Sequence, residues 1–264
     1  MIYIITNRKP HTFNYLNKYV KIVTPTKNSW SKTKFNNKDT LMYYFQYEVN
    51  IKDLPPLPKH RKMIGSPNGV LACKDKKEMR KTFIKKDIST PKTWFNIEDA
   101  EVPFIARPKY HHMGKELYVA RSEEEKQELI KNPKIDETWY FSELLNLKKE
   151  YRIVLFNYEV ILAYKFPLYG SVEETVSKRL EYRGTEMAAK QIPTKIPKHY
   201  EELAIKAMKT IKLGFGGLDL LVDENDNIYI GEINNSPTMY PIIKDVLKEA
   251  IVKYIETEKK NEIR

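Results

Sequence analysis

The sequence is short of the residues that cross-link a chain or carry it through a membrane. It has a single cysteine, Cys73, in 264 residues, which excludes a disulfide scaffold and any zinc site built on several cysteines. A lone thiol is typical of proteins from a reducing compartment. No apolar run reaches the roughly 18 residues that a membrane-spanning helix requires. The first ten residues have no basic segment ahead of their apolar run, so they predict a first strand and no signal peptide.

Acidic residues are also in short supply: 35 Asp and Glu stand against 46 Lys and Arg, for a net charge of +11. The imbalance lies in residues 1–90, whose net charge is +13, whereas residues 91–264 carry −2. A basic region attracts polyanions such as nucleic acid, nucleotide phosphates or acidic peptides; a well-solvated lysine surface is the alternative. The hydrophobic content of 41% predicts a folded protein despite 31% charged residues.

Local patterns predict alternating strands and helices. Strands are expected at residues 2–6, 20–24, 104–107, 117–120, 139–145, 151–156, 160–166, 218–223 and 228–233. Helices are expected at residues 39–47, 74–86, 122–131, 199–212 and 242–258. Residues 65–69 are expected to form a loop, the proline-rich residues 54–58 a lobe boundary, and the polar residues 170–197 an irregular, mobile segment.

The most informative stretch is the expected hairpin of residues 218–233, whose turn lies at residues 224–227. If the loop is symmetric about residues 225 and 226, Asp219 lies directly opposite Glu232, with Cβ atoms about 4.5–5.5 Å apart. Asn234 shares their face. Opposed carboxylates repel each other, whereas a divalent cation between them would reverse the sign of the interaction. These residues are therefore candidate Mg²⁺ ligands, and a surface hairpin with solvated carboxylates is the alternative.

Glycine is scarce, with nine residues in the chain, yet four of them flank this hairpin: Gly214, Gly216, Gly217 and Gly231. This concentration indicates special backbone angles or the close approach of a ligand. The other face of the hairpin carries apolar residues that are expected to pack into a core, namely Leu218, Leu220, Val222 and Ile233.

A site for a metal-bound phosphate also needs cations. Basic residues open a predicted helix or interrupt predicted apolar strands at four positions: Lys76, Arg107, Arg152 and Lys165. An arginine in an apolar strand needs an anion, and its planar guanidinium suits phosphate. A structural salt bridge is the alternative for each one, but their coincidence with the hairpin favours an anionic ligand.

Other candidates are weaker. His111 and His112 follow the strand at residues 104–107 and could bind metal or substrate; exposed loop histidines are the alternative. Cys73 has no neighbouring base and is expected to be a small buried residue. Residues 9–62 interleave tyrosine and lysine with other aromatics, a mixture that can bind single-stranded nucleic acid. No nucleic-acid-binding motif accompanies it, so core aromatics beside a solvated lysine surface are the preferred interpretation.

Residues 70–255 resemble the ATP-grasp superfamily. Asp75-Lys76, with the following Ile88-Ser-Thr-Pro91, is similar to the DK…GxPxP segment of that family, and residues 104–108 are similar to its PVVVKP strand, with Arg107 in place of the usual second lysine. Glu150-Tyr-Arg152 and the next strand pair resemble the RimK-like branch, which adds glutamate to a ribosomal protein tail. The specific match is Gly217-Leu-Asp219-Leu-Leu221 with Glu232-Ile-Asn234, which resembles the family's GxDxL…ExN magnesium ligands.

The resemblance implies a role for each matching residue. Asp219, Glu232 and Asn234 would hold two Mg²⁺ ions, or Mn²⁺ in their place. Nucleotide contacts would come from Lys76, Arg107, His111 and the glycine of the phosphate flap, Gly114, and from the interlobe hinge Glu143, Leu144 and Leu145. The catalytic cations would be Arg107, Arg152 and Lys165.

The resemblance also implies an α/β (α+β) fold of the ATP-grasp type, with two lobes, residues 71–145 and 146–264, clamping ATP behind a short basic α/β lobe, residues 1–70. It implies an ATP-dependent, ADP-forming ligase that joins a carboxylate to an amine as an amide through an acylphosphate. One substrate would be acidic, or an amino acid, peptide or protein tail, and no membrane would be involved. A catalytically altered polyanion- or nucleic-acid-binding module is the alternative. The expected location is the cytoplasm, of a host cell if the Lys-, Asn- and Ile-rich composition reflects a phage source.

Overall fold

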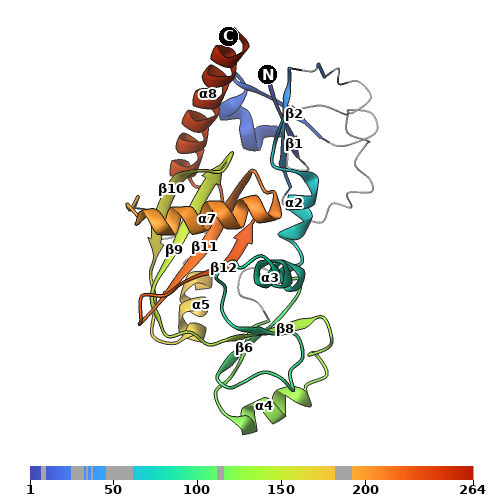
Figure 1. Cartoon of the computed structure of the whole chain (residues 1–264), viewed down its shortest axis with the longest axis vertical. Helices are drawn as coiled ribbons and strands as arrows, with labels where there is room; N and C mark the ends of the chain where they lie inside the picture. The colour runs from blue at the N-terminus through green and yellow to red at the C-terminus, as the bar shows by residue number, and fades with distance from the viewer. Residues whose placement is uncertain are drawn as a thin grey trace.

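The computed structural model describes residues 1–6, 10–24, 33, 35–36, 38–45, 62–111, 116–181 and 192–263. Over these residues the chain forms three four-stranded sheets with helices between and around them (Figure 1). We name them the N-terminal sheet (β2–β1–β3–β4), the middle sheet (β5–β8–β6–β7) and the C-terminal sheet (β10–β9–β11–β12).

The N-terminal sheet is parallel throughout. It consists of β1 (Ile2–Thr6), β2 (Val20–Val23), β3 (Thr40–Tyr44) and β4 (Lys62–Ile64), with the 3₁₀ helix η1 (Pro10–Leu16) after β1. The expected helix at residues 39–47 was wrong, because Thr40–Tyr44 form the buried strand β3 between β1 and β4. Asp39 accepts a hydrogen bond from the Asn36 N–H at 2.7 Å instead of capping a helix. The proline-rich residues 54–58 lie outside the described residues.

The C-terminal sheet is antiparallel and consists of β9 (Leu147–Phe156), β10 (Glu159–Phe166), β11 (Phe215–Asp223) and β12 (Ile228–Asn234). On one face it packs against α7 (Lys198–Ile211), and the leucines and isoleucines of that face are buried as expected. On the other face it packs against α8 (Pro241–Ile263), and the aromatic residues Phe156 and Phe215 join that core. The two expected hairpins are therefore present, and they share one sheet through the pairing of β9 with β11.

The middle sheet is smaller and consists of β5 (Thr93–Trp94), β6 (Phe104–Pro108), β7 (Tyr118–Ala120) and β8 (Trp139–Glu143), with α4 (Glu123–Ile130) after β7. The Ser122 hydroxyl accepts a hydrogen bond from the Glu125 N–H at 3.3 Å, as the sequence predicts for the start of α4. The sheet has a separate apolar core centred on Phe104 and Phe141.

Two short helices connect the N-terminal sheet to the middle sheet: α2 (Pro67–Ala72) and α3 (Lys76–Lys85). The loop expected at residues 65–69 is therefore partly helical, since the Ser66 hydroxyl caps α2 by accepting from the Gly69 N–H at 3.0 Å. The irregular segment expected at residues 170–197 contains the helix α5 (Val172–Glu181), and residues 182–191 lie outside the described part of the chain.

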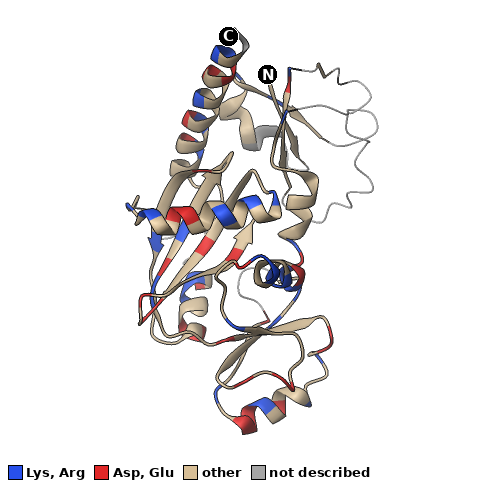
Figure 2. Cartoon of the chain, in the orientation of Figure 1, with Lys and Arg blue, Asp and Glu red and all other residues tan. Residues whose placement is uncertain are grey.

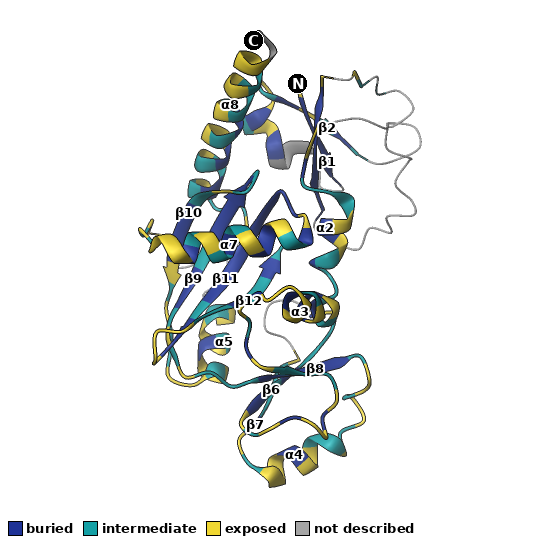
Figure 3. Ribbon diagram, in the orientation of Figure 1, coloured by how far each residue is buried: buried dark blue, intermediate teal, exposed yellow. Residues whose placement is uncertain are grey.

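Burial follows the sheets, with the buried strands enclosed by helices whose outer faces are exposed (Figure 3). Among the described residues, no helix is long and apolar enough to cross a membrane. Phe35 packs edge-on against the Tyr3 ring, with 4.9 Å between centroids, and Phe45 is buried. These two aromatics of the basic region thus belong to the core and do not form an exposed stacking surface.

Candidate active site

A row of four polar side chains crosses the C-terminal sheet from edge to edge. Tyr164 of β10 pairs with Arg152 of β9, Arg152 pairs with Asp219 of β11, and Asp219 pairs with Glu232 of β12. Because paired residues share a face of an antiparallel sheet, all four lie on the same side. The predicted register of Asp219 opposite Glu232 is confirmed.

A β-bulge lies directly beside this pair. Toward the turn, Leu220 pairs with Ile230, so Gly231 is an extra residue of β12 between the pairs Leu220–Ile230 and Asp219–Glu232. Near the turn, the observed pairing is therefore shifted by one residue from the symmetric pairing that we assumed. The extra residue of the bulge, Gly231, removes this shift, so Asp219 still pairs with Glu232.

Asp219 is held by an arginine. Its Oδ1 lies 2.5 Å from Arg152 Nε and its Oδ2 accepts from Arg152 Nη2 at 3.2 Å. Both side chains are largely buried, and Asp219 Oδ1 makes no hydrogen bond of acceptable geometry despite its burial. Asp219 thus already holds a cationic group, and a carboxylate in this position could bind a divalent cation in exchange for the guanidinium.

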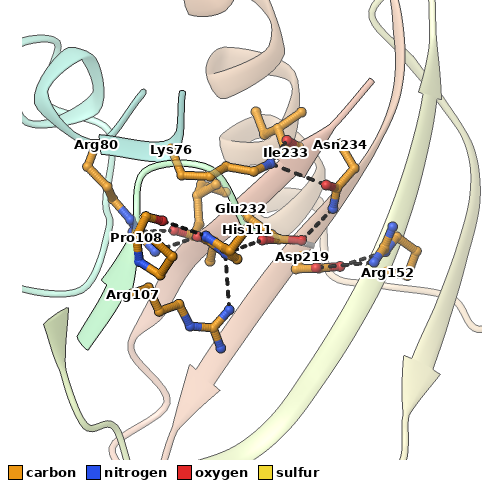
Figure 4. A network of polar contacts seen from close by, with 12 residues as sticks. Lys76, Arg80, Arg107, Pro108, His111, Arg152, Asp219, Glu232, Ile233 and Asn234 are labelled. Carbon is orange, nitrogen blue, oxygen red and sulfur yellow. Dashed lines mark hydrogen bonds and ion pairs between the residues drawn. The ribbon is translucent and has the colours of Figure 1, made fainter. Parts of the chain in front are cut away.

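Glu232 and Asn234 lie next to Lys76, which opens α3 (Figure 4). Lys76 Nζ donates to the Ile233 carbonyl at 2.7 Å and to Asn234 Oδ1 at 3.2 Å. The Asn234 amide donates to Glu232 Oε1 at 2.6 Å. Lys76, Asn234 and Glu232 therefore form one hydrogen-bonded network, and Asp219 lies beside it as the cross-strand partner of Glu232.

His111 brings the middle sheet to this network. It is 5% exposed, so of the two interpretations the exposed loop histidine was wrong; His112 lies outside the described residues. Its Nδ1 lies 3.0 Å from the Pro108 carbonyl, and its Nε2 lies 3.2 Å from Arg107 Nη1 and 3.5 Å from Glu232 Oε2. In the neutral ring Nδ1 donates to Pro108 and Nε2 accepts from Arg107, whereas the protonated ring also carries a proton at Nε2, which attracts Glu232.

The two carboxylates differ in their electrostatic surroundings. Burial raises the pKa of Asp219, Arg152 opposes this effect and Glu232 adds to it. Burial also acts to raise the pKa of Glu232, but Lys76, His111 and Asn234 outweigh it and hold this pKa well below the usual range. Burial lowers the pKa of His111, against the effect of Glu232. Glu232 is therefore the readily ionised member of the pair, and Asp219 is the member that gains most from a bound cation.

Two arginines that sequence reasoning missed also reach this region. Arg80, on α3, is 5% exposed and donates through Nη1 to the Ile230 carbonyl at 2.9 Å and through Nη2 to the Gly231 carbonyl. Arg179, on α5, makes a two-pronged ion pair with Glu150, at 2.9 Å for both bonds. Both arginines lie inside helices with many charged residues, where no sequence signal separates a buried position from a solvated one. The acidic positions of β11 and β12 lie next to the basic residues of α3 (Figure 2).

Some predicted residues are not brought to the network. Lys165 is exposed and pairs with Tyr151, so it lies on the α7 face, opposite to Arg152. In the hinge, the N–H groups of Glu143 and Leu144 already donate to the carbonyls of Lys92 and Pro103, at 2.9 and 3.0 Å. These two N–H groups are therefore occupied within the protein. Leu145, the third predicted hinge residue, is half-buried, and the hinge stays a prediction. Gly114 lies outside the described residues.

The glycines act mainly by close packing of the backbone. A Cβ at Gly214 would lie 2.2 Å from Gly65 N, and a Cβ at Gly217 would lie 3.0 Å from Arg152 Nη1. Gly214 therefore lets two backbone segments touch, and Gly217 leaves room for the guanidinium that holds Asp219. The four glycines that flank the hairpin all lack the positive φ that favours glycine. Cys73 is buried, as predicted, and burial raises the pKa of its thiol to about 12, with Lys76 opposing.

A divalent cation would depend on few protein ligands here. In the described residues no group of three or more His, Cys, Asp or Glu is placed to hold a metal ion. The donor set is two carboxylates and the amide oxygen of Asn234, which suits Mg²⁺ that keeps water and phosphate oxygens as its other ligands. The surrounding cations, Lys76, Arg80, Arg107 and Arg152, outnumber the two carboxylates, so the site favours an anionic ligand.

The three-sheet fold and this site define an ATP-grasp protein. The chain belongs to the RimK-like ATP-grasp family, whose model matches residues 68–257, so the predicted resemblance and fold class are confirmed. It is accordingly an ATP-dependent, ADP-forming ligase of the class that makes carbon–nitrogen bonds. No curated protein matches the sequence.

Several solved structures share the fold at low identity. The RiPP-associated ATP-grasp ligase of Chryseobacterium gregarium, in complex with ADP and a leader and core peptide, is 16% identical, with 96% of each chain covered and a TM-score of 0.66. The ATP-grasp ligase PsnB with its minimal precursor is 12% identical, with 96% of this chain and 98% of that one covered and a TM-score of 0.63. N5-carboxyaminoimidazole synthetase of Staphylococcus aureus is 15% identical, with 90% and 71% covered and a TM-score of 0.59.

Proposed function

We propose that the chain joins a carboxylate to an amine through an acylphosphate, with ATP as the phosphoryl donor. The observation that carries the proposal is that Asp219, Glu232 and Asn234 lie together with Lys76, Arg107 and Arg152 at one partly buried site. Opposed carboxylates surrounded by cations suit a metal-bound triphosphate and have little reason to exist otherwise.

Asp219, Glu232 and Asn234 would hold Mg²⁺, two ions as the resemblance implies, with Mn²⁺ as a substitute. When bound, the metal neutralises and orients the phosphates of ATP. The Asp219 carboxylate faces Arg152 and the Asn234 oxygen faces Lys76, so both oxygens already lie against cationic groups and would suit a metal cation.

The cations of the network have separate tasks. Lys76 and Arg107 would bind phosphate oxygens, and Arg152 would stabilise negative charge on the transferring phosphoryl group or the acylphosphate. His111 would orient Arg107 toward the carboxylates, since it lies between them. Lys165 has no part in this proposal, because it lies on the other face of the sheet.

The chemistry needs no nucleophile from the protein. A substrate carboxylate oxygen attacks the γ-phosphorus and ADP leaves; an amine nitrogen then attacks the carbonyl carbon, loses a proton, and phosphate leaves. Cys73 is unsuited to this work because it is buried and its thiol pKa is raised to about 12.

A peptide or protein tail is the substrate class that we favour over a free amino acid. Two of the structural neighbours were solved with peptide substrates, a leader and core peptide in one and a minimal precursor in the other. The +13 charge of residues 1–90 would suit an acidic acceptor. The three sheets would form lobes 1–70, 71–145 and 146–264, and the single buried cysteine suits the cytoplasm.

The test is ADP release from Mg·ATP with a pool of amino acids and peptides, followed by a mass search for the new amide. Glu232→Gln should lower turnover at least about 100-fold, because it removes charge that a metal requires. The matched control is Glu224→Gln in the turn of the same hairpin, which should leave turnover unchanged. Normal Mg·ATP binding in Asp219→Asn/Glu232→Gln would contradict the metal assignment. Salt-sensitive nucleic-acid binding without ADP release would favour the polyanion-binding alternative.

A further inference from the structure

The pair Asp219–Glu232 depends on the bulge at Gly231. From the turn to Leu220 the hairpin follows one register, in which Leu220 pairs with Ile230. If that register continued without a bulge, Asp219 would pair with Gly231, and Glu232 would pair with Leu218. Because paired residues share a face, Glu232 would then point into the apolar core that contains Leu218. The extra residue is therefore what places Glu232 beside Asp219.

One side chain holds both carbonyl groups of this bulge. Arg80 donates to the Ile230 carbonyl at 2.9 Å and to the Gly231 carbonyl. In a regular strand, consecutive carbonyls point in opposite directions, so one guanidinium can reach both only where the strand is bulged. Thr90 adds a contact to the Ile230 carbonyl at 3.2 Å, and the Ser89 carbonyl accepts from the Ile230 N–H at 2.8 Å.

Arg80 is itself fixed by its surroundings. It lies on α3 one helical turn after Lys76, its neighbours Met79 and Phe83 are buried in the core shared with α7, and it is 5% exposed. A lysine would replace it only in part, because its ammonium sits on a shorter side chain and lacks the fixed, parallel N–H groups of a planar guanidinium.

We propose that Arg80 is a positioning residue for the metal site: it holds the Gly231 bulge in the form that presents Glu232 beside Asp219. It acts through the backbone and does not touch the metal or the phosphates. The inference rests on the proposed role of Asp219 and Glu232 as metal ligands.

The test measures metal affinity apart from turnover. Mn²⁺ binding in the presence of a non-hydrolysable ATP analogue is followed by electron paramagnetic resonance, and binding of the same analogue in EDTA is followed by calorimetry. Arg80→Met should lower Mn²⁺ affinity about 10–100-fold, the range typical of lost outer-shell partners, and should change metal-free nucleotide affinity less than about threefold. Arg80→Lys, which keeps the charge but not the planar pair of N–H groups, should recover part of the loss.

The matched control is Lys126→Met. Lys126 of α4 is likewise buried and donates to two backbone carbonyls, those of Glu98 and Ala100 at 3.0 and 2.7 Å, but it lies in the middle sheet region away from the carboxylates. It should lower stability like Arg80→Met yet leave Mn²⁺ affinity unchanged, so the comparison separates positioning from general destabilisation.

Wild-type Mn²⁺ affinity in Arg80→Met would overturn the proposal, and so would an equal loss with and without metal. If Arg80→Met does not fold, Arg80→Lys decides in the same way, because wild-type affinity in that variant contradicts the need for both contacts. Asp219→Asn separates failure of the proposed metal site from failure of the positioning role of Arg80. If it binds Mn²⁺ normally, the metal site itself is wrong; if it loses Mn²⁺ and the Arg80 variants do not, only the positioning role fails.

Discussion

The middle sheet and the other two sheets are built differently. The middle sheet has its own apolar core, drawn from residues between 94 and 141. The N-terminal and C-terminal sheets share two cores, one that joins Tyr43 to Leu218 and one that joins Tyr44 to Phe215. Two sheets with common cores on both faces form a single body. The middle sheet is attached to that body through its connections and through local contacts, such as that of the buried His111 with Glu232.

The active-site residues divide along the same line. Asp219, Glu232, Asn234 and Arg152 belong to the shared body, and α3 adds Lys76 because Met79 and Phe83 pack into the same core. Arg107 and His111 come from the middle sheet and the residues after β6. The proposed metal ligands therefore all lie on the shared body, whereas the contact of His111 with Glu232 depends on how the middle sheet is placed.

The largest expected effect is on stability, and it tests this division directly. Leu218→Ala removes a fully buried side chain from the shared body and should cost about 2–5 kcal/mol of unfolding free energy. Because the core is common, amide hydrogen exchange should speed up in both the N-terminal and C-terminal sheets. Phe104→Ala should cost about 3–5 kcal/mol, with exchange accelerated in residues 93–143 alone.

Phe104→Ala is also the control for Leu218→Ala, because it creates a cavity in the separate apolar core of the middle sheet. Faster exchange in β1 or β11 of that variant, to the same degree as in β6, would show that the middle sheet is not a separate unit.

Much of the fold could be predicted because its signals are local. The strands of both C-terminal hairpins and the capped helix α4 follow from β-branched runs, turn residues and Ser122. β3 could not be predicted in this way. Asp39-Thr40 looks like a helix start, and only parallel pairing with β1 and β4 on its two sides makes the segment a strand.

The site shows the same contrast between local and non-local information. The pairing of Asp219 with Glu232 was predicted correctly, although the assumed loop was incorrect. The loop that we assumed is one residue longer than the observed one, and the bulge at Gly231 adds one residue to the same strand, so the two differences cancel at Asp219. Nothing in the sequence marks the bulge except Gly231 itself. The burial of His111 and Arg80 depends on contacts with β12, which lies more than a hundred residues away in the chain, so their positions could not be read from local patterns.

A smaller effect is expected on nucleotide affinity, and its sign should depend on whether the metal is present. Without metal, the Asp219 carboxylate is ion-paired with the Arg152 guanidinium, with 2.5 Å between Oδ1 and Nε. Asp219→Asn removes this charge and releases the guanidinium, so metal-free ATP should bind about 3–10-fold more tightly, the gain expected from one charge-assisted contact. Mg·ATP should bind more weakly than to the wild type. Calorimetric titrations in EDTA and in Mg²⁺ measure both.

Asp226→Asn is the matched control for these opposite changes in metal-free ATP and Mg·ATP affinity. Asp226 belongs to the turn of the same hairpin and is also ion-paired, to Lys148 at 2.9 Å, but both groups are exposed. It should move neither affinity. Weaker metal-free binding to Asp219→Asn would show that Arg152 does not face the phosphates, and would remove it from the proposed phosphoryl site.

The smallest effect concerns a surface contact between the middle sheet and the shared body. Arg121, after β7, makes a two-pronged ion pair with Glu173 of α5, at 2.8 and 2.9 Å, and both side chains are over 40% exposed. Exposed pairs contribute little, so Glu173→Gln should lower the unfolding free energy by less than about 1 kcal/mol, and less still in high salt. The hydrogen bond from Arg121 lowers the pKa of Glu173 to about 2, against the opposing effect of burial.

Because this pKa is lower in the folded state than in the unfolded one, the contribution of the pair is present above the usual carboxyl range and is lost as the pH falls toward 2. Urea unfolding at several pH values and salt concentrations measures it. Glu181→Gln is the control, since its exposed partner Lys178 lies on α5 itself, so the pair does not connect the two regions. If the Arg121–Glu173 pair helps to hold the middle sheet to the shared body, Glu173→Gln should speed hydrogen exchange in β7 and α4, and Glu181→Gln should not. A salt-independent loss well above 1 kcal/mol would instead mean that the middle sheet is held to the body more firmly than its separate core implies.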